Sequence, residues 1–391
     1  MTGNTLGWVI VAFVLYLLMM IAIGAFYAKG NNNSEDYFLG GRKLNGFVAA
    51  LSAQASDMSG WLLMGLPGAI YLTGVGGDGW IAIGLFIGTT LNWLFIATKL
   101  RRYTIRANNS VTLPTYFENR FHDDKKVLMT VSSITIVVFF LVYCASALSA
   151  GGQLFESVFG IDYHVALTIG ALVVLVYTFL GGFTAVCVTD FIQGMLMLVG
   201  ILAVPLFAYH FLTTGGTTLS AGLEASGADS ANFLNLMKNG DGSNNIVSVI
   251  SGLGWGLGYF GMPHILVRFM AVRDEKEMTK SKATAISWVA LSLGFAVFIG
   301  ILGRAYLPEL VNGNNEKVFI EMIKKVFTVE MRAPFIAGLF LCGILAAIMS
   351  TADSQLLVSA SSVAEDIFKG LLKKDADDKT VMNVSRVTVL V

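Results

Sequence analysis

One carboxylate, Asp57, lies inside an apolar stretch that is long enough to cross a membrane. Residues 51–69 read LSAQASDMSGWLLMGLPGA, so Ser56, Ser59 and Gly60 lie close to the acid. A charged side chain at the bilayer centre costs about 2.5–3.5 kcal/mol on the insertion scale, and glycine weakens a helix. We therefore expect a broken helix whose freed backbone groups line a polar cavity, with a solute and ion site at mid-membrane.

A second set of polar residues lies near the other end of the chain, in the run ILAAIMSTADSQLL. Ala347, Ser350 and Thr351 are three and four residues apart, which places them on one face of a helix. Their hydroxyls, with carbonyls freed by the break near Asp57, offer the oxygen ligands that a hard cation such as sodium prefers. The alternative is that the hydroxyls only bond to their own helix or to a neighbouring one. Asp353 follows closely but falls on a different face from Ser350.

Two intramembrane carboxylates, Asp57 and Asp190, each allow more than one role. Asp57 is an ion ligand, an electrostatic partner for a nearby ligand, or a cap for the broken backbone. Asp190, in the run GGFTAVCVTDFIQ, is either a cap or interfacial charge near a helix end, or part of a second ion or proton path. Carboxylates inside a membrane are functional by default, because their burial is costly.

Four aromatic residues, Trp61, Tyr143, Trp255 and Tyr259, flank the expected breaks or lie in mid-helix. Aromatic side chains in membrane proteins often anchor at the interface or fill the core, but Trp61 and Trp255 each abut a break at mid-depth. These positions suit closure over a small solute with an apolar body. A solute carboxylate would suit a half-helix N-terminus near Ser59, where backbone N–H groups favour anions.

The composition is that of a chain built around a membrane. Of 391 residues, 55% are hydrophobic and 13% are charged, whereas about a quarter are charged in soluble proteins. The apolar runs have the length of membrane spans, which predicts an all-α polytopic membrane protein in one domain, residues 1–391. We expect helices at 6–27, 46–72, 79–97, 127–158, 165–180, 185–212, 246–270, 284–305 and 334–368. A tenth apolar run begins near residue 381 and is too short to span, so we expect a fold that is incomplete at its C-terminal side.

Two of the expected helices are interrupted, those at 46–72 and 246–270, the second by five glycines and Pro263. They lie five helices apart and therefore run in opposite directions. Paired broken segments at matching positions of two halves are typical of inverted-repeat transporters, whose site lies at the break. We expect the first repeat at 46–212 and the second, incomplete, at 246–391, after the N-terminal helix 6–27.

Lysine and arginine residues are distributed unevenly among the loops. If the N-terminus is outside, nineteen of them lie in loops on the inner side and six on the outer side. Because positive charges gather on the cytoplasmic side, this bias predicts that the N-terminus is outside. The formal net charge is zero, which gives no reason to expect a nucleic-acid partner.

Several other function classes lack support in the sequence. The three cysteines, Cys144, Cys187 and Cys342, lie in apolar runs and are interpreted as reduced packing residues. No two of the four histidines have metal-ligand spacing, so we expect no metal other than sodium. The glycines of 252–261 lack the strand and acidic residue of a nucleotide fingerprint. No nucleophile–base set or redox motif indicates an enzyme, and the first apolar run is too long for a signal peptide.

Seven stretches together resemble the sodium:solute symporter family, most closely its bacterial proline-transporting branch. They are LSAQASDMSGWLLMGLPGA at 51–69, YFLGGRKL at 37–44, TLPTYFENRF at 112–121, FFLVYCASAL at 139–148, GGFTAVCVTDFIQG at 181–194, GWGLGYFGMPHILVRFMA at 254–271 and ILAAIMST at 344–351. The resemblance implies a LeuT-type fold with one extra N-terminal helix. It implies sodium-coupled symport of L-proline into the cell by alternating access, across a bacterial cytoplasmic (inner) membrane.

The same resemblance implies a role for individual residues. Sodium would be held by the backbone carbonyls of Ala55, Met58 and Ala347 and the hydroxyls of Ser350 and Thr351, with Asp57 essential to its binding or coupling. The proline pocket would be lined by Ser59, Gly60, Trp61, Tyr143, Trp255, Tyr259 and Pro263. Arg42 and Asp190 would assist coupling or the inward path of the ion. Asp353 departs from the proline branch, which often has an uncharged residue there.

Two alternatives remain beside sodium-coupled proline symport. The first is sodium-coupled symport of another small solute, such as pantothenate, a sugar or another amino acid. The second is a membrane sensor or channel that transports nothing, because a fold by itself does not determine a function.

Overall fold

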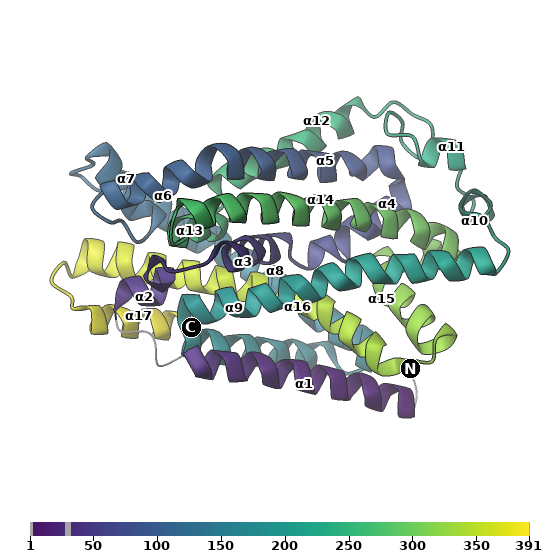
Figure 1. Ribbon diagram of the computed structural model, residues 1–391, viewed down its shortest axis with the longest axis horizontal. Helices are drawn as coiled ribbons and strands as arrows, with labels where there is room; N and C mark the ends of the chain where they lie inside the picture. The colour runs from purple at the N-terminus through teal and green to yellow at the C-terminus, as the bar shows by residue number, and fades with distance from the viewer. Residues whose placement is uncertain (1–2, 28–32, 391) are drawn as a thin grey trace.

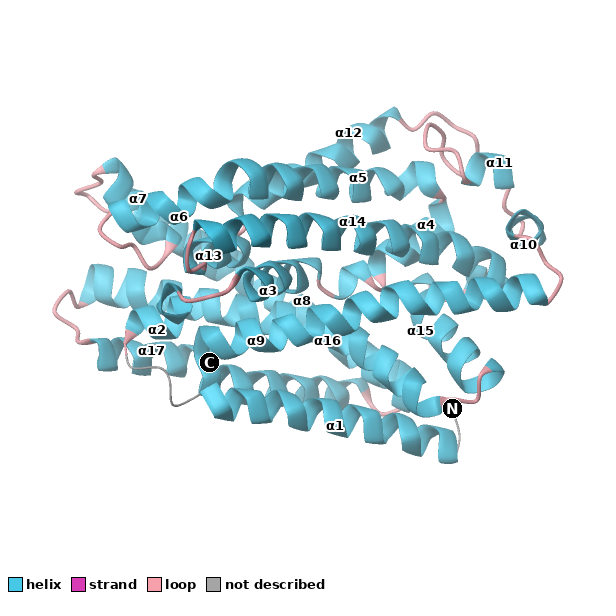
Figure 2. Cartoon of the chain, in the orientation of Figure 1, coloured by secondary structure: helices cyan, strands magenta, loops and turns pink. Residues whose placement is uncertain are grey.

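The computed structural model describes residues 3–27 and 33–390, which fold into helices, with no β-strand among these residues (Figures 1 and 2). The helices are α1 Asn4–Tyr27, α2 Ser34–Leu39, α3 Gly46–Met58, α4 Gly65–Thr73, α5 Val75–Leu91, α6 Ala97–Arg106, α7 Leu113–Phe121, α8 Val127–Phe159, α9 Tyr163–Thr214, α10 Leu219–Ala225, α11 Ser230–Phe233, α12 Ile246–Trp255, α13 Pro263–Ala271, α14 Glu275–Tyr306, α15 Val318–Ile323, α16 Pro334–Ser361 and α17 Asp378–Leu390. Short 3₁₀ turns connect them at η2 Gly40–Arg42, η3 Gly60–Leu62, η5 Gly256–Gly261, η6 Pro308–Asn312 and η7 Asn315–Lys317, and π-helical turns lie at η4 Asn92–Ile96, η8 Lys324–Glu330 and η9 Ser362–Leu372.

The long helices lie side by side along the longest axis of the molecule (Figure 1). Six helices of the described chain are long and apolar enough to cross a membrane, and the bent pair α12–α13 makes a seventh. α9 contains a break at Gly182, where φ is 61° and ψ is −162°. This break confirms the division that the sequence predicts between helices 165–180 and 185–212. It lies at a glycine because glycine adopts this backbone conformation without strain.

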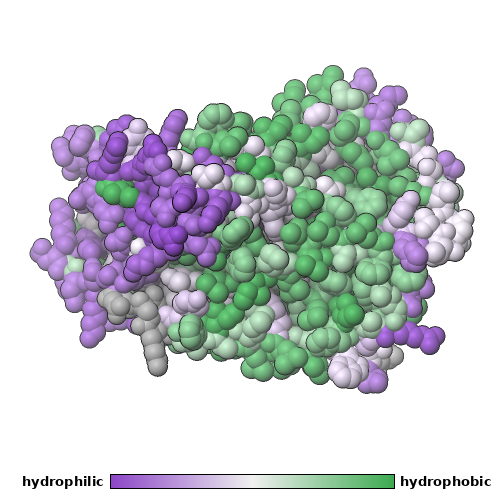
Figure 3. Space-filling view, in the orientation of Figure 1, coloured by the Kyte–Doolittle hydropathy of each residue, from purple (hydrophilic) through white to green (hydrophobic). Residues whose placement is uncertain are grey.

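The surface has the pattern of a membrane protein. An apolar band covers the middle of the molecule, and hydrophilic residues gather at one end, over α2, α6, α7 and α17 (Figures 1 and 3). We call this end the basic end, because the α6–α7 region and the loop before α14 carry exposed arginines such as Arg102 and Arg273. α1 begins at the opposite end of the molecule (Figure 1).

The expected break in helix 46–72 is confirmed. α3 ends at Met58, and Ser59 has φ 50° and ψ −173°, so the helical path is lost at that residue. The η3 turn and then α4 continue the chain. A positive φ is strained for serine and is tolerated where the surrounding structure enforces it, often at functional sites.

The second expected break is also confirmed. α12 passes into the η5 turn, and α13 then begins at Pro263, with a bend of 47° between the two parts. Proline suits this first helical position, because its missing N–H would be unpaired there anyway.

Paired glycines hold the second interrupted region, α12 and η5, close to α5. A Cβ atom added to Gly84 would lie 2.2 Å from the carbonyl oxygen of Gly252, and one added to Gly88 would lie 2.2 Å from that of Gly256. Both pairs have a four-residue spacing, the small-xxx-small pattern that lets membrane helices approach closely. α5 therefore packs directly on α12 and η5 and fixes the position of the break.

Two helices form the centre of the bundle. In the most apolar part of the α16–η9 helix 83% of the residues are buried, against 28% in α8. α3 is buried along nearly its whole length and packs against α9, α13, α14 and α16. Both helices predicted to carry the ion ligands are therefore well shielded from lipid.

Some helix boundaries differ from the predictions for local reasons. α14 begins at Glu275 rather than near residue 284, since the Asp274 side chain caps it by accepting a hydrogen bond from the Glu277 amide. The helix predicted at 79–97 extends from Val75 to Arg106 through the η4 π-turn. Both extensions are polar and project beyond the apolar part of the helix, so hydrophobicity alone misses them.

Candidate functional site

The hydroxyls of α16 and the carbonyls of α3 meet at the centre of the bundle. Ser350 Oγ donates a hydrogen bond to the Ala55 carbonyl oxygen at 2.9 Å and lies 3.3 Å from the Ala347 carbonyl oxygen. Thr351 Oγ1 donates to the same Ala347 oxygen at 3.0 Å. All four residues are fully buried. The structure thus gathers two hydroxyl and two carbonyl oxygens into one cluster, the donor set that suits an alkali cation.

Met58, predicted as a further carbonyl ligand, is the last residue of α3. Since the chain leaves the helical path at Ser59, no helical amides follow from which the last carbonyls of α3 could accept hydrogen bonds. The Met58 side chain points into a cavity of about 110 Å³. Met58 lies three residues after Ala55 in the chain.

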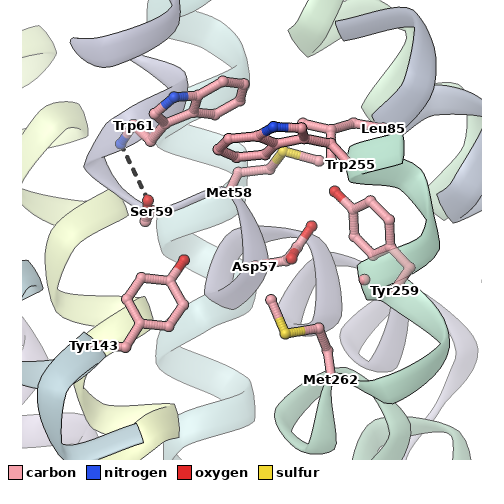
Figure 4. Close-up of a pocket in the computed structure, with 10 residues that line it drawn as sticks. Asp57, Met58, Ser59, Trp61, Leu85, Tyr143, Trp255, Tyr259 and Met262 are labelled. Atoms are coloured by element: carbon pink, nitrogen blue, oxygen red, sulfur yellow. Dashed lines mark hydrogen bonds between the residues drawn. The ribbon is translucent and has the colours of Figure 1, made fainter. Parts of the chain in front are cut away.

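The Asp57 carboxylate faces the same cavity (Figure 4). The side chain is 8% exposed, and Oδ2 has no hydrogen-bond partner among the described residues. The hydroxyl of Tyr259 points toward this carboxylate (Figure 4). A buried carboxylate with an unpaired oxygen is costly, and a bound cation or a cationic group on a solute offsets that cost.

Aromatic side chains from four elements enclose the cavity. Trp61 of η3 and Trp255 of α12 stack with their ring centroids 5.9 Å apart and 21° between the planes. Tyr143 of α8 and Tyr259 of η5 lie on either side of Asp57 (Figure 4). The predicted aromatic residues are therefore brought together, although they are up to about two hundred positions apart in the sequence.

A second, larger cavity of about 520 Å³ adjoins the first. Both share Ser59, Trp61, Tyr143, Trp255 and Met262 in their lining. The larger one also touches Gly60 and extends past α4 to Glu316 of η7. η7 follows the end of α14 that lies away from the basic end (Figure 1). The site is therefore reached from the end opposite the basic end.

Sequence reasoning missed three residues that line the smaller cavity, Leu85, Gly258 and Met262. It also predicted Pro263 as a lining residue, but Pro263 lines neither cavity. Pro263 starts α13 one residue beyond Met262 and is buried. The half-helix N-terminus expected after Ser59 is only the three-residue η3, and the Trp61 amide already donates to Ser59 Oγ at 3.1 Å.

Arg42 lies away from the cavity, at the basic end. Its guanidinium donates to the carbonyl oxygens of Met270 at 2.9 Å and Ser110 at 2.8 Å, and it forms an ion pair with Glu35 at 3.3 Å. Burial, together with the nearby Arg101, lowers the pKa of Arg42 to about 10, which leaves it charged at neutral pH. Arg42 thus fastens the end of α13 to the loops of the basic end.

Asp190 lies between the oxygen cluster and the basic end. It is fully buried and pairs with Arg268 at 3.0 Å, so its charge faces a partner inside the protein. Arg268, which lies within the expected helix 246–270, belongs to α13 and is 1% exposed. Its signal in the sequence was an arginine between apolar residues on both sides, in the run PHILVRFMA.

Asp353 faces a different helix from Ser350, as expected, and accepts a hydrogen bond from the Tyr177 hydroxyl at 2.6 Å.

Comparisons with known proteins identify the family. The model of the sodium:solute symporter family matches residues 37–391. A protein of Salmonella typhimurium named sodium/proline symporter is 45% identical, and the match covers 98% of this chain and 74% of that protein. The high-affinity proline transporter PutP of Bacillus subtilis is 44% identical over 95% of this chain and 76% of its own length. The chain belongs to the sodium:solute symporter family. It is thus a multi-pass membrane protein of a transporter family, with sodium as the coupling ion, and not an enzyme.

The fold of this symporter also has a solved counterpart. A sodium-coupled sialic acid symporter in a substrate-bound, outward-open state superposes with a TM-score of 0.81, at 21% identity, over 98% of this chain and 79% of the other. This likeness shows that the symporter has the LeuT-type fold.

Proposed function

We propose that this symporter couples the movement of sodium to the uptake of L-proline. The observation that carries the proposal is the oxygen cluster of Ala55, Ala347, Ser350 and Thr351 beside a small cavity walled by aromatic rings. Relatives named sodium/proline symporter, at 45% identity, support the choice of proline.

In this proposal the two sides of the α3 break have different roles. Before the break, the carbonyls of Ala55 and Met58 and the carboxylate of Asp57 act on sodium, with Ala347, Ser350 and Thr351 across from them on α16. After it, the cavity walls receive the apolar ring of the solute. These walls are Ser59, Gly60, Trp61, Tyr143, Trp255 and Tyr259. Pro263 shapes the pocket by starting α13, and Arg42 and Asp190 support coupling from the basic end.

The arrangement supports alternating access between two repeats, 46–212 and 246–391. We propose that the basic end faces the cytoplasm of a bacterial inner membrane, in accord with the positive-inside bias, so that the N-terminus is outside. The cavity then opens to the outside, while the segment between the oxygen cluster and the cytoplasm is closed by packed side chains.

Because each ligand adds contacts to the outward-open state, sodium and proline raise each other's affinity by the same factor. The test is uptake of labelled L-proline into vesicles that carry the full-length protein, driven by a sodium gradient. We expect uptake only with sodium. Uptake that is equal without sodium contradicts the proposal.

A panel of unlabelled solutes in the same assay identifies the substrate. Pantothenate, sugars and other amino acids compete with labelled proline if the pocket takes them instead. Sodium flux without solute movement is the result that a channel gives. The aromatic cavity of about 110 Å³ favours a compact, partly apolar solute over a sugar.

A further inference from the structure

Arg268 makes contacts that extend beyond its ion pair with Asp190. Its Nε donates to Ser52 Oγ of α3 at 3.0 Å, and its Nη2 donates to Ser354 Oγ of α16 at 2.5 Å as well as to Asp190. Nη1 donates to the His264 carbonyl oxygen of its own helix at 2.7 Å. One guanidinium on α13 therefore joins α3, α9 and α16.

The contacts of Arg268 on α3 and α16 lie close to the oxygen cluster along both helices. Ala55 and Ser350 join the two helices directly at the oxygen cluster. Ser52 lies three residues before Ala55, and Ser354 lies four residues after Ser350, which is about one helical turn in each case. Both steps lead toward the basic end, because α3 starts there and α16 runs toward it. Arg268 thus joins the same two helices one turn nearer to the basic end than the oxygen cluster.

We propose that Arg268 is a positioning residue for sodium, which holds α3 and α16 at the spacing that the oxygen cluster needs and closes the route from that cluster to the basic end. The inference rests on the function proposed above. An ion leaving toward the basic end passes between α3 and α16, where the guanidinium joins Ser52 to Ser354. Release inward then requires these hydrogen bonds and the Asp190 ion pair to break together.

Unpaired polar atoms on the same helices support a second, open arrangement. Both ring nitrogens of His264, both side-chain amide atoms of Gln355 and Oδ1 of Asp190 are buried without hydrogen-bond partners among the described residues. Buried polar atoms without partners are unfavourable. When the hydrogen bonds of Arg268 break, water that enters between the helices would form hydrogen bonds with these unpaired atoms. This favours the open arrangement and explains why polar residues occupy this part of the core.

A native cysteine reports on this route. Cys187 of α9 lies one turn before Asp190 and is fully buried. In a background with Cys144→Ala and Cys342→Ala, we expect a membrane-permeant maleimide to label Cys187 slowly and sodium to slow it further. In Arg268→Gln, labelling becomes about tenfold faster and insensitive to sodium, as expected for the loss of hydrogen bonds from a charged group.

A second readout follows the sodium site itself. The sodium concentration that gives half-maximal proline binding rises about tenfold in Arg268→Gln, while proline affinity at saturating sodium stays within about threefold of the wild type. Arg304→Gln is the matched control. Arg304 is also buried, at 9% exposed, but it lies near the C-terminal end of α14, away from the basic end, and donates to Ser226 Oγ. Arg304→Gln should change neither the labelling rate of Cys187 nor the sodium concentration for half-maximal proline binding. If the role of Arg268 is purely structural, Arg268→Gln lowers the amount of folded protein and leaves both quantities unchanged.

Ser354→Ala removes a single contact of Arg268 and decides the question if Arg268→Gln does not fold. It should shift both values in the same direction by a smaller factor. The inference is overturned if a folded variant shows no faster labelling of Cys187 and the same sodium requirement for proline binding as the wild type. Absence of sodium-driven proline uptake by the wild type would instead refute the proposed function, so the two failures are distinguishable.

Discussion

The Ser350 hydroxyl of α16 donates a hydrogen bond of 2.9 Å to the carbonyl oxygen of Ala55 on α3. The two residues are 295 positions apart in the chain, yet this contact joins the helix that breaks beside the cavity to the most buried of the long apolar helices. The position of the proposed sodium site follows from it, because a carbonyl at a helix end and a hydroxyl on a continuous helix face the same point.

Ser350→Ala should raise the sodium concentration for half-maximal proline binding by about tenfold, since one oxygen ligand is lost and the Ala55 carbonyl keeps no partner on α16. Binding of labelled proline over a sodium titration measures it. Ser361→Ala is the control, because that hydroxyl donates only to Val358 of its own helix. An unchanged sodium requirement in Ser350→Ala would remove the hydroxyl from the site.

Asp57→Asn keeps the shape of the side chain and removes its charge. We expect sodium-dependent proline binding to weaken about 10- to 1,000-fold, the range that one opposite charge within a few ångströms produces. The same substitution at Asp78, an acid in the first turn of α5 that accepts from Thr73 Oγ1, should leave binding unchanged. Equal losses in both variants would indicate a general effect on folding.

The stacked pair Trp61 and Trp255 should contribute to solute binding jointly. Each change to alanine is expected to raise the proline Kd, and the double variant should lose less than the sum of the two by about 0.5–1.5 kcal/mol, the coupling of an aromatic pair. Equilibrium binding of the four proteins at saturating sodium gives this value. Trp8→Ala on α1, 49% exposed, serves as the control. Strict additivity would show that the rings act independently.

Gly88→Ala tests the close approach of α5 to η5. The added Cβ would lie 2.2 Å from the Gly256 carbonyl oxygen, so we expect a loss of about 1–3 kcal/mol of stability, as for an overpacked core. Thermal unfolding in detergent measures this loss. Gly254→Ala, whose added Cβ meets no atom within 4 Å, should have almost no effect. If both variants unfold alike, the glycine pairs do not determine the packing.

The sequence alone predicted the elements that carry the site. Gly60 and the polar residues beside it predict the break after Asp57, because a helix interrupted by charge and glycine in an apolar stretch must line a cavity. The spacing of Ala347, Ser350 and Thr351 predicts a shared helix face, because helical geometry alone determines it. These local patterns were enough to predict the breaks and an ion site, whereas the family was inferred from the resemblance of seven stretches. The structure confirms the breaks and brings Ser350 to Ala55, and the comparisons confirm the family.

Only the tertiary structure decided which residues from distant helices meet. It placed Leu85 and Met262 in the cavity wall, left Pro263 outside it, and paired the buried Arg268 with Asp190. No spacing within one helix encodes such contacts, because they depend on how α3, α9, α13 and α16 pack against each other. A buried charge is stabilised by a partner that the fold supplies, and so the chain by itself shows the charge but not its partner.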